Sequence, residues 1–322
     1  MTVRYRDGIE IELSDGTRVV CDADQPDGDV NVVSHAHSDH LPRESATAVC
    51  SELTAALGTA RMEGTLSRTT DEHVELLPAG HVAGSRATLM TDSDGTRYLY
   101  TGDVCTRSRF YLGGFEPPDA DVLITEATYG EPEYVFPDHE AVVAEIEAWF
   151  EETSDQPVLL FGYALGRAQK LQLLADDAGR TVYTTPGVLR VNEPIEDRLG
   201  VEFGSQEYGD ETELEAGDAL VLPMTTTRID WIERLAEETG AATGGFSGWA
   251  IDSSYRFRGD FDAAFPLSDH CDFEELRALV DAVDPERVYT QHGSGDRLAE
   301  ELTGAGYTAT TIKQNQTSLS DF

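Results

Sequence analysis

The sequence predicts a mixed α/β fold built from two parts, and three observations support this prediction. The first third of the 322 residues contains short runs of alternating apolar and polar side chains separated by Gly- and Asp-containing turns, which is typical of β-strands. From residue 138 the spacing of the apolar residues becomes that of a helix. Strand-like and helix-like segments then alternate as far as residue 250, which favours a parallel sheet covered by helices.

The first part consists mainly of predicted strands, over residues 9–13, 17–23, 29–37, 86–91, 96–103 and 121–130. The turns 14-SDG-16 and 92-DSDG-95 each join two of these strands, so two hairpins are expected. The strand over 29–37 runs directly into a group of histidines.

The second part begins with a predicted helix over 138–152, which starts at an aspartate suited to cap it. The following predicted elements are a strand–helix unit over 157–177, a strand over 219–226, helices over 228–240 and 273–284, a strand over 287–293, and a last short helix and strand.

The charge of the chain is extreme, with 61 acidic against 23 basic residues and a formal net charge of −38. The acids are spread over the whole chain, and Lys170 and Lys313 are its only lysines. A carboxylate-covered surface of this kind predicts a halophilic protein, and it argues against binding nucleic acid through a broad basic face. No apolar run approaches the roughly 20 residues that span a bilayer, and no signal peptide is evident, so a cytoplasmic location is expected. The four cysteines contain no CxxC pair and are expected to be free thiols.

Three of the eight histidines lie within the stretch 33-VSHAHSDH-40. Residues i and i+2 of an extended segment point the same way, so His35 and His37 can bind one metal ion. A turn after Ser38 would direct Asp39 and His40 towards a second ion. Imidazole and carboxylate are ligands suited to Zn²⁺.

Three further segments share this arrangement, in which a strand ends in residues able to bind metal: 77-LPAGHVAGS-85, 99-LYTGD-103 and 287-RVYTQHG-293. A single HxH pair, or one aspartate in a turn, carries little information by itself. Six of the eight histidines nevertheless fall in strand-end segments, at positions 35, 37, 40, 81, 270 and 292, which favours a metal centre.

The HxHxDH run, the later Gly-His pair and the Gly-Asp strand end resemble the metallo-β-lactamase fold. The acid in 123-LITEATYG-130, the segment 268-SDHCDF-273 and the segment 289-YTQHG-293 resemble the three additional motifs of the β-CASP nucleases, and 161-FGYALGRAQKL-171 resembles a helix start of that family. The chain is most similar to short members that act in mRNA 3′-end processing or as DNA-ligase-associated exonucleases.

The resemblance implies a metallo-β-lactamase αββα sandwich formed by residues 1–150 and 246–322, with an inserted α/β β-CASP domain over 151–245. It also implies two Zn²⁺ ions and seven metal ligands: His35, His37 and His81 for one ion, Asp39, His40 and His292 for the other, and Asp103 between both. Glu126 and His270 would form a pair in which the carboxylate orients an imidazole that protonates the leaving group. Asp39 and Asp103 are expected to take part in catalysis with this pair.

Alternatives stay open at several positions. His270, rather than His292, could be the second-site ligand, and Glu126 could be a buried acid with a purely structural role. Four arginines are candidates for phosphate contacts, and three aromatic residues are candidates for base stacking: Arg107, Arg109, Arg167, Arg190, Tyr129, Tyr134 and Phe136. A surface or ion-pair arginine is the alternative for each of the four, and an aromatic core under a loop is the alternative for at least one of the three.

The expected function is hydrolysis of phosphodiester bonds in RNA or single-stranded DNA by a two-zinc nuclease. His292 favours RNA, because a histidine at the last motif accompanies RNA-acting members, although the ligase-associated group carries one as well. Two rivals remain, a hydrolase of small esters or thioesters and a non-catalytic nucleic-acid-binding scaffold. Whether the chain is a monomer or a homodimer stays open.

Overall fold

The computed structural model describes residues 2–313 and divides into two compact units, which are considered separately below. Unit 1 contains the residues up to 135 and those from 270 onward, and unit 2 contains residues 136–269. These limits differ from the expected boundaries at 150 and 245. The helix α2 (His139–Glu152) accounts for part of the difference, because its Val142 and Ile146 are buried in the core of unit 2.

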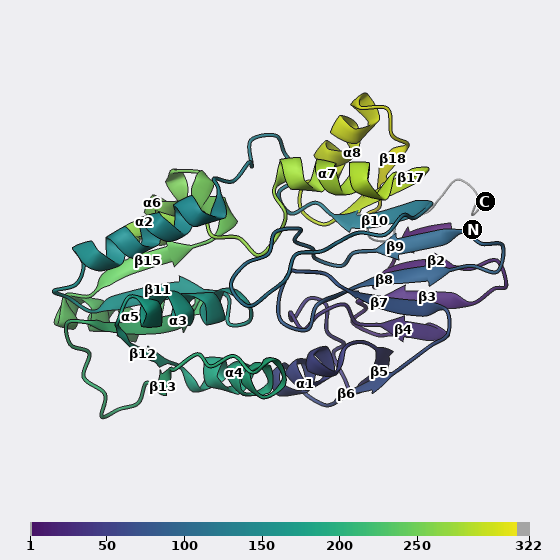
Figure 1. The fold of residues 1–322 in the computed structure, drawn as a ribbon. Coiled ribbons are helices and arrows are strands. Elements are labelled where there is room, and N and C mark those ends of the chain that lie inside the picture. The colour runs from purple at the N-terminus through teal and green to yellow at the C-terminus, as the bar shows by residue number, and fades with distance from the viewer. Residues whose placement is uncertain (1, 314–322) are drawn as a thin grey trace. The chain divides into compact units, whose positions relative to one another are not determined.

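Unit 1 contains two six-stranded sheets (Figure 1). The first sheet has the order β1 (Thr2–Tyr5), β2 (Ile9–Glu12), β3 (Arg18–Cys21), β4 (Val30–Val32), β5 (Ala46–Val49) and β6 (Leu66–Thr69). The second has the order β18 (Ala309–Thr311), β17 (Arg287–Gln291), β10 (Val122–Glu126), β9 (Arg97–Tyr100), β8 (Arg86–Thr91) and β7 (Val74–Pro78). Both predicted hairpins are present, as the antiparallel pairs β2–β3 and β8–β9.

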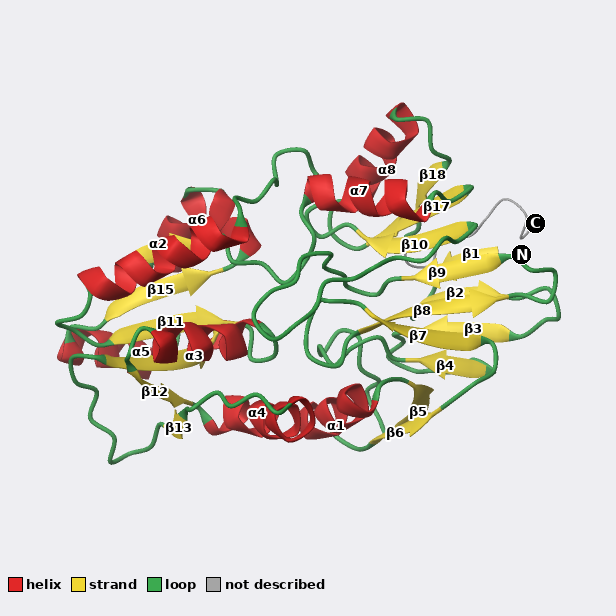
Figure 2. Ribbon diagram, viewed as in Figure 1, coloured by secondary structure: helices red, strands yellow, loops and turns green. Residues whose placement is uncertain are grey.

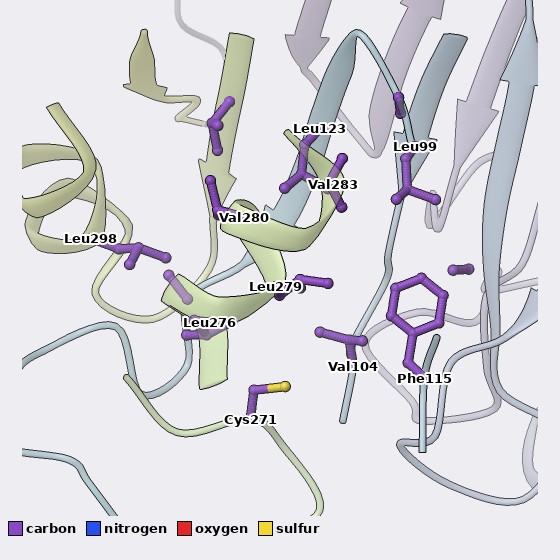
Figure 3. Close-up of a cluster of buried hydrophobic side chains, with 14 of the residues drawn as sticks. Leu99, Val104, Phe115, Leu123, Cys271, Leu276, Leu279, Val280, Val283 and Leu298 are labelled. Carbon is purple, nitrogen blue, oxygen red and sulfur yellow. The ribbon is translucent and has the colours of Figure 1, made fainter. Parts of the chain in front are cut away.

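A hydrophobic core joins the facing sides of these two sheets, with Ile11 and Val19 from the first sheet and Met90 and Ile124 from the second. Within the residues that the structure describes, three helices complete unit 1: α1 (Glu52–Arg61), α7 (Phe273–Val283) and α8 (Gly295–Gly304). Figure 3 shows the apolar residues of α7 against the other face of the second sheet, where Leu279 and Val283 belong to one cluster with Leu99 and Leu123.

Unit 2 is built on one sheet whose six strands are all parallel (Figure 2). Their order is β13 (Gln206–Glu207), β12 (Thr181–Thr184), β14 (Asp218–Pro223), β11 (Val158–Gly162), β15 (Ala242–Phe246) and β16 (Ala263–Phe265). Its other helices are α3 (Arg167–Asp177), α4 (Pro186–Leu199), α5 (Asp230–Thr239) and α6 (Ser254–Gly259), with 3₁₀ turns at Met224–Thr226 and Gly248–Ile251.

The strand β11 illustrates why the central strands of unit 2 are almost wholly apolar. Val158 and Leu160 enter the core on one face of the sheet, while Leu159 and Phe161 enter the core on the other. A strand of a parallel sheet covered on both faces requires apolar side chains at every position, so it has no alternating pattern. Within residues 2–313, no helix is both long enough and apolar enough to cross a bilayer.

Unit 2 also buries a group of three charged residues. The Arg167 guanidinium donates to Asp269 Oδ2 at 2.6 Å, and the Lys170 ammonium donates to the other oxygen of the same carboxylate. All three side chains are at most 3% exposed. Asp269 therefore compensates two buried cations.

Asp269→Asn is expected to destabilise the protein by about 3–5 kcal/mol, because it leaves the two buried cations without their shared carboxylate. Lys170→Met is the matched comparison and should cost less, because the Arg167–Asp269 pair is retained. Urea unfolding of both variants measures the difference, and equal free energies of unfolding would contradict this account.

Candidate metal centre

The histidine stretch begins where β4 ends and the chain leaves the first sheet of unit 1. His40 N–H donates to the carbonyl of His37 at 3.1 Å, so the chain turns between these two residues. His35 is completely buried and His40 almost so, whereas the side chain of Asp39 is 73% exposed. The extended segment before the turn thus carries His35 and His37, and the turn itself carries Asp39 and His40.

Four ligand atoms converge on one point, and they come from three separate strand ends. His37 Nδ1 lies 3.0 Å from His35 Nε2 and 3.2 Å from His81 Nε2. Asp103 Oδ2 lies 3.4 Å from His35 Nε2 and 3.5 Å from His81 Nε2. A tetrahedral zinc site with ligand distances of about 2.0–2.1 Å has edges of about 3.4 Å, so this donor set fits zinc in both chemistry and spacing.

The backbone beside His81 depends on a glycine. Gly80 has φ +72, and a Cβ atom there would lie 2.1 Å from the carbonyl oxygen of Cys105. The close approach of these two loops places His81 and Asp103 beside each other, because Asp103 precedes Cys105 by two residues. A side chain at position 80 would push the two ligand-bearing loops apart.

A second set of residues surrounds His40 and is more open than the first. His40 Nε2 lies 3.7 Å from Asp103 Oδ1 and 3.8 Å from Asp39 Oδ2. The ring of His292 lies 5.7 Å from that of His40, measured between centroids. His292 has φ +53, a conformation uncommon for a residue with a side chain, and such strain is often found at functional sites.

Asp22 is a member of the site that the sequence analysis did not identify. Its Oδ2 lies 2.8 Å from His40 Nδ1 and accepts a hydrogen bond from the Tyr100 hydroxyl at 2.7 Å. Its Oδ1 accepts from Ser34 N–H at 2.7 Å. A carboxylate on the outer nitrogen fixes the orientation of a ligand imidazole. Asp22 directly follows β3, whereas the sequence predicted a strand over 17–23 and so placed this residue within the strand.

Glu126 and His270 form a direct pair, with 2.7 Å between Glu126 Oε1 and His270 Nδ1. Glu126 is fully buried, and it also accepts hydrogen bonds from Val104 N–H at 2.9 Å and from Thr128 N–H at 3.2 Å. The ring of His270 lies 4.4 Å from the ring of His81, while that of His292 lies on the His40 side. The two late histidines therefore approach different parts of the cluster.

The electrostatics of the site separate the histidines into two groups. Burial lowers the pKa of His35, and burial followed by the nearby His270 lowers the pKa of His81 well below its usual value. Both rings are thus neutral, which is the form that binds metal. Burial alone would lower the pKa of His40 as well, but Asp103 and then Asp22 raise it to about 10. His40 is therefore protonated in the absence of metal. The carboxylates of Asp103 and Asp22, which stabilise this positive charge, would also favour a metal cation beside His40.

Asp103 is the acid most strongly affected by this arrangement. Burial alone would raise its pKa, but His40 and then His35 outweigh burial and hold that pKa well below its usual value. Asp103 is therefore ionised throughout the physiological range and can act as a metal ligand from both of its oxygens.

Most of the candidates for phosphate contact and base stacking are ion-paired or buried. Arg107 is paired with Glu275 at 2.6 Å, Arg109 is buried with its guanidinium on the carbonyl of Gly80, and Arg167 is held by Asp269. The remaining candidate, Arg190, is exposed on α4. Two of the three aromatic candidates, Tyr129 and Phe136, are buried, which removes them as stacking surfaces, and Tyr134 is half-buried.

Comparison with known proteins adds several relatives. No protein-family model matches the chain. The chain is 34% identical over 301 residues to a probable DNA ligase of Opitutus terrae, and the match covers 89% of this chain and 29% of that protein. It is 28% identical over 217 residues to an RNase J-like protein of Methanocaldococcus jannaschii, covering 56% of this chain and 50% of that protein. The chain thus spans half or less of the length of these relatives.

The fold also has a solved counterpart. A crystal structure of a protein of unknown function from Enterococcus faecalis V583 matches with a TM-score of 0.66, covering 98% of this chain and 97% of that one. At 14% sequence identity, this likeness concerns the fold alone.

Proposed function

We propose that the chain is a metal-dependent nuclease of the β-CASP branch of the metallo-β-lactamase fold, which hydrolyses phosphodiester bonds of single-stranded nucleic acid. The observation that carries this proposal is the convergence of His35, His37, His81 and Asp103 at 3.0–3.5 Å, beside the Glu126–His270 pair. The relatives named as a ligase and as RNase J-like support a nucleic acid as the substrate.

Two Zn²⁺ ions are proposed as the cofactors. His35, His37 and His81 would hold the first, Asp39, His40 and His292 the second, and Asp103 both. When bound, such a pair of ions supplies Lewis acidity towards the phosphate and a nucleophile near neutral pH. Asp22 orients His40 through its outer nitrogen. In this proposal Asp39 binds from the exposed side, which leaves the second position accessible to substrate.

The Glu126–His270 pair would deliver the proton that the leaving oxygen needs. The carboxylate accepts from His270 Nδ1, which leaves Nε2 as the atom that carries the transferable proton. A partner carboxylate raises the proton affinity of an imidazole, which suits a general acid. Because the ring of His292 lies beside His40, whereas the ring of His270 lies beside His81, we assign the second-site ligand to His292.

DNA is the proposed polymer. The match to the probable DNA ligase extends over 89% of the chain, whereas the match to the RNase J-like protein covers 56%. The matched segment forms part of a probable DNA ligase, and a nuclease that trims DNA ends would supply ends that a ligase can join. RNA is the competing substrate, and both polymers belong in the same assay.

The deciding experiment measures zinc by mass spectrometry and follows the degradation of end-labelled single-stranded DNA and RNA in high salt. Zinc near two equivalents and cleavage of at least one polymer are expected. A zinc-loaded sample that cleaves neither polymer, and that does not differ from Asp103→Ala, would overturn the proposal. Adding a thioester substrate tests the rival small-molecule hydrolase.

Asp22→Asn is expected to weaken zinc binding by about 10–100-fold, because the amide cannot hold His40 Nδ1–H as the carboxylate does. Tyr100→Phe is the matched control, since it removes one hydrogen bond to the same carboxylate and leaves the others in place. Competition with a chelating dye measures both affinities. An affinity for Asp22→Asn equal to that of Tyr100→Phe would contradict the orienting role of Asp22.

Zinc binding is expected to release close to one proton at pH 7.5. His40 has a pKa of about 10 in the metal-free protein and is therefore protonated at that pH, and a ligand imidazole must lose this proton. Apparent zinc affinity should accordingly rise with pH up to about 10. Calorimetric titration in buffers of different ionisation enthalpy measures the number of protons released, and His40→Ala should release fewer. A value near zero for the unaltered protein would contradict the assignment.

A further inference from the structure

Ser34 lies between a proposed metal ligand and a buried carboxylate of unit 1. Its side-chain oxygen is 2.6 Å from Asp22 Oδ2 and 2.9 Å from His35 Nδ1. All three side chains are buried. Buried polar groups take their hydrogen-bond partners from the protein around them, so the three form one hydrogen-bonded chain with Ser34 in the middle.

The direction of the first hydrogen bond follows from the other partners of Asp22. Its Oδ1 accepts from Ser34 N–H at 2.7 Å, and its Oδ2 accepts from the Tyr100 hydroxyl at 2.7 Å. His40 Nδ1 lies 2.8 Å from the same Oδ2. Donors thus surround this carboxylate, which acts as an acceptor. The Ser34 hydroxyl therefore donates its proton to Asp22, because a hydrogen bond to a carboxylate is stronger than one to a neutral ring nitrogen.

The second hydrogen bond then determines which nitrogen of His35 carries the proton. A hydroxyl has a single proton, and that of Ser34 is given to Asp22, so Ser34 Oγ accepts from His35 Nδ1–H. A neutral imidazole protonated at Nδ1 keeps its lone pair at Nε2. The opposite tautomer would place two acceptors 2.9 Å apart with no proton between them.

Nε2 is also the nitrogen of His35 that faces the proposed first metal position. It lies 3.0 Å from His37 Nδ1 and 3.4 Å from Asp103 Oδ2. Asp103 is the acceptor that competes for the proton, because an Nε2–H group would donate to it. A separation of 3.4 Å is long for an N–H···O hydrogen bond, whereas the 2.9 Å at Nδ1 is ordinary. Ser34 therefore favours the tautomer that leaves Nε2 able to bind metal.

The packing around Ser34 holds its hydroxyl in this position. Gly102 has φ +57, and a Cβ atom there would lie 2.7 Å from both Cβ and Oγ of Ser34. Gly102 directly precedes Asp103, so the loop that carries this ligand packs on Ser34. The Ser34 carbonyl accepts from Arg86 N–H at 2.8 Å. A small side chain with a hydroxyl group fits this space.

One oxygen of Asp22 thereby reaches two ligands that belong to different proposed metal positions. Oδ2 contacts Nδ1 of His40 directly and Nδ1 of His35 through Ser34. A hydrogen-bond partner on the outer nitrogen orients a ligand imidazole and raises its basicity. The contact with His40 alone would concern the second position, and Ser34 extends the effect of Asp22 to the first.

We propose that Ser34 is a positioning residue, which holds His35 in the tautomer protonated at Nδ1 and so presents Nε2 to the first metal ion. Through Ser34, the single carboxylate of Asp22 prepares one ligand in each metal position. The part played by the ion rests on the proposed function. The tautomer of His35 is a property of the metal-free protein and can be tested without it.

The first measurement is the tautomer of His35 in the metal-free protein. Long-range ¹H–¹⁵N NMR spectra of histidine-labelled protein in a chelator distinguish protonated from unprotonated ring nitrogens, and comparison with His35→Ala identifies the signals of His35. The unaltered protein should carry the proton on Nδ1. Ser34→Ala should shift the population towards Nε2–H, because Nδ1 loses its acceptor while Asp103 still accepts from Nε2.

The second measurement is zinc affinity, determined by competition with a chelating dye. Ser34→Ala is expected to weaken zinc binding by about 10–100-fold. Tyr100→Phe is the matched control, because each variant removes one hydroxyl that donates to Asp22 Oδ2, but only Ser34 contacts His35. Tyr100→Phe should keep the Nδ1–H tautomer and should weaken zinc binding less than Ser34→Ala. Circular dichroism verifies that both variants fold.

A proton on Nε2 of His35 in the unaltered protein would overturn the proposal. So would a Ser34→Ala variant that keeps the Nδ1–H tautomer and binds zinc as tightly as Tyr100→Phe, which is the result expected if Ser34 only supports the fold. Hydrolysis of bis(p-nitrophenyl) phosphate by the zinc-loaded protein tests the nuclease function separately. The expected tautomer and zinc affinities without hydrolysis of this ester or of nucleic acid would uphold the role of Ser34 and reject the nuclease.

Discussion

Asp103→Ala should lower the rate of phosphodiester hydrolysis by about 10³-fold or more, and this is the largest effect expected for any single substitution. Asp103 Oδ2 lies 3.4–3.5 Å from the ligand nitrogens of His35 and His81, while Oδ1 lies 3.7 Å from that of His40. One side chain therefore serves both proposed metal positions. Metal ions contribute several kcal/mol to transition-state stabilisation, and each 1.36 kcal/mol corresponds to a factor of ten.

Zinc content distinguishes this loss from unfolding. The Asp103→Ala variant should retain its circular dichroism spectrum but hold fewer zinc equivalents than the unaltered protein. Asp94→Ala is the control, because this substitution removes the same charge from the same unit. Asp94 lies in the exposed turn between β8 and β9. Full zinc content in Asp103→Ala, or equal loss of activity in both variants, would show that Asp103 does not bridge two ions.

His270→Ala is expected to lower the cleavage of nucleic acid by about 10²–10⁴-fold while leaving zinc content unchanged. The reason is that His270 is proposed to give a proton to the leaving oxygen, with Nδ1 held by Glu126 at 2.7 Å. A substrate whose leaving group needs no protonation should be affected much less. Parallel rates on single-stranded DNA and on bis(p-nitrophenyl) phosphate provide the comparison.

His292→Ala is the matched variant and should behave in the opposite way. A lost metal ligand lowers zinc content and slows both substrates together. Glu126→Gln, which keeps the shape of the side chain but removes its charge, should resemble His270→Ala in a milder form. If His270→Ala instead loses zinc and slows both substrates equally, then His270 is the second-site ligand and the roles of the two late histidines must be exchanged.

Most members of the site could be expected from local patterns. The HxHxDH stretch, Gly80-His81 and Gly102-Asp103 each follow a strand, and parallel or adjacent strands bring such ends to one edge of a sheet. Asp22 has the same placement after β3 but was not identified, because a lone aspartate in a predicted strand end resembles many turn residues. Only the distances to His40 and Tyr100 identify it as part of the site.

The arginines show how little a local pattern says about partners. Arg107, Arg109 and Arg167 were candidates for phosphate contacts, and a surface or ion-pair arginine was the alternative for each. The structure places them in contact with Glu275, Gly80 and Asp269, inside their units. These partners lie 29 to 168 residues away in the chain and leave no local signal, so the pairings were not predictable.

The sequence by itself determined the hairpins β2–β3 and β8–β9, the helices α2 and α7, and the clustering at strand ends of residues able to bind metal, because these features depend on side-chain spacing along a few neighbouring residues. The tertiary structure decided which ligand atoms meet, that Asp22 stands behind His40, and that unit 2 extends over 136–269. These features depend on contacts between residues far apart in the chain. These contacts form only when the sheets have formed and packed, so no local pattern in the sequence predicts them.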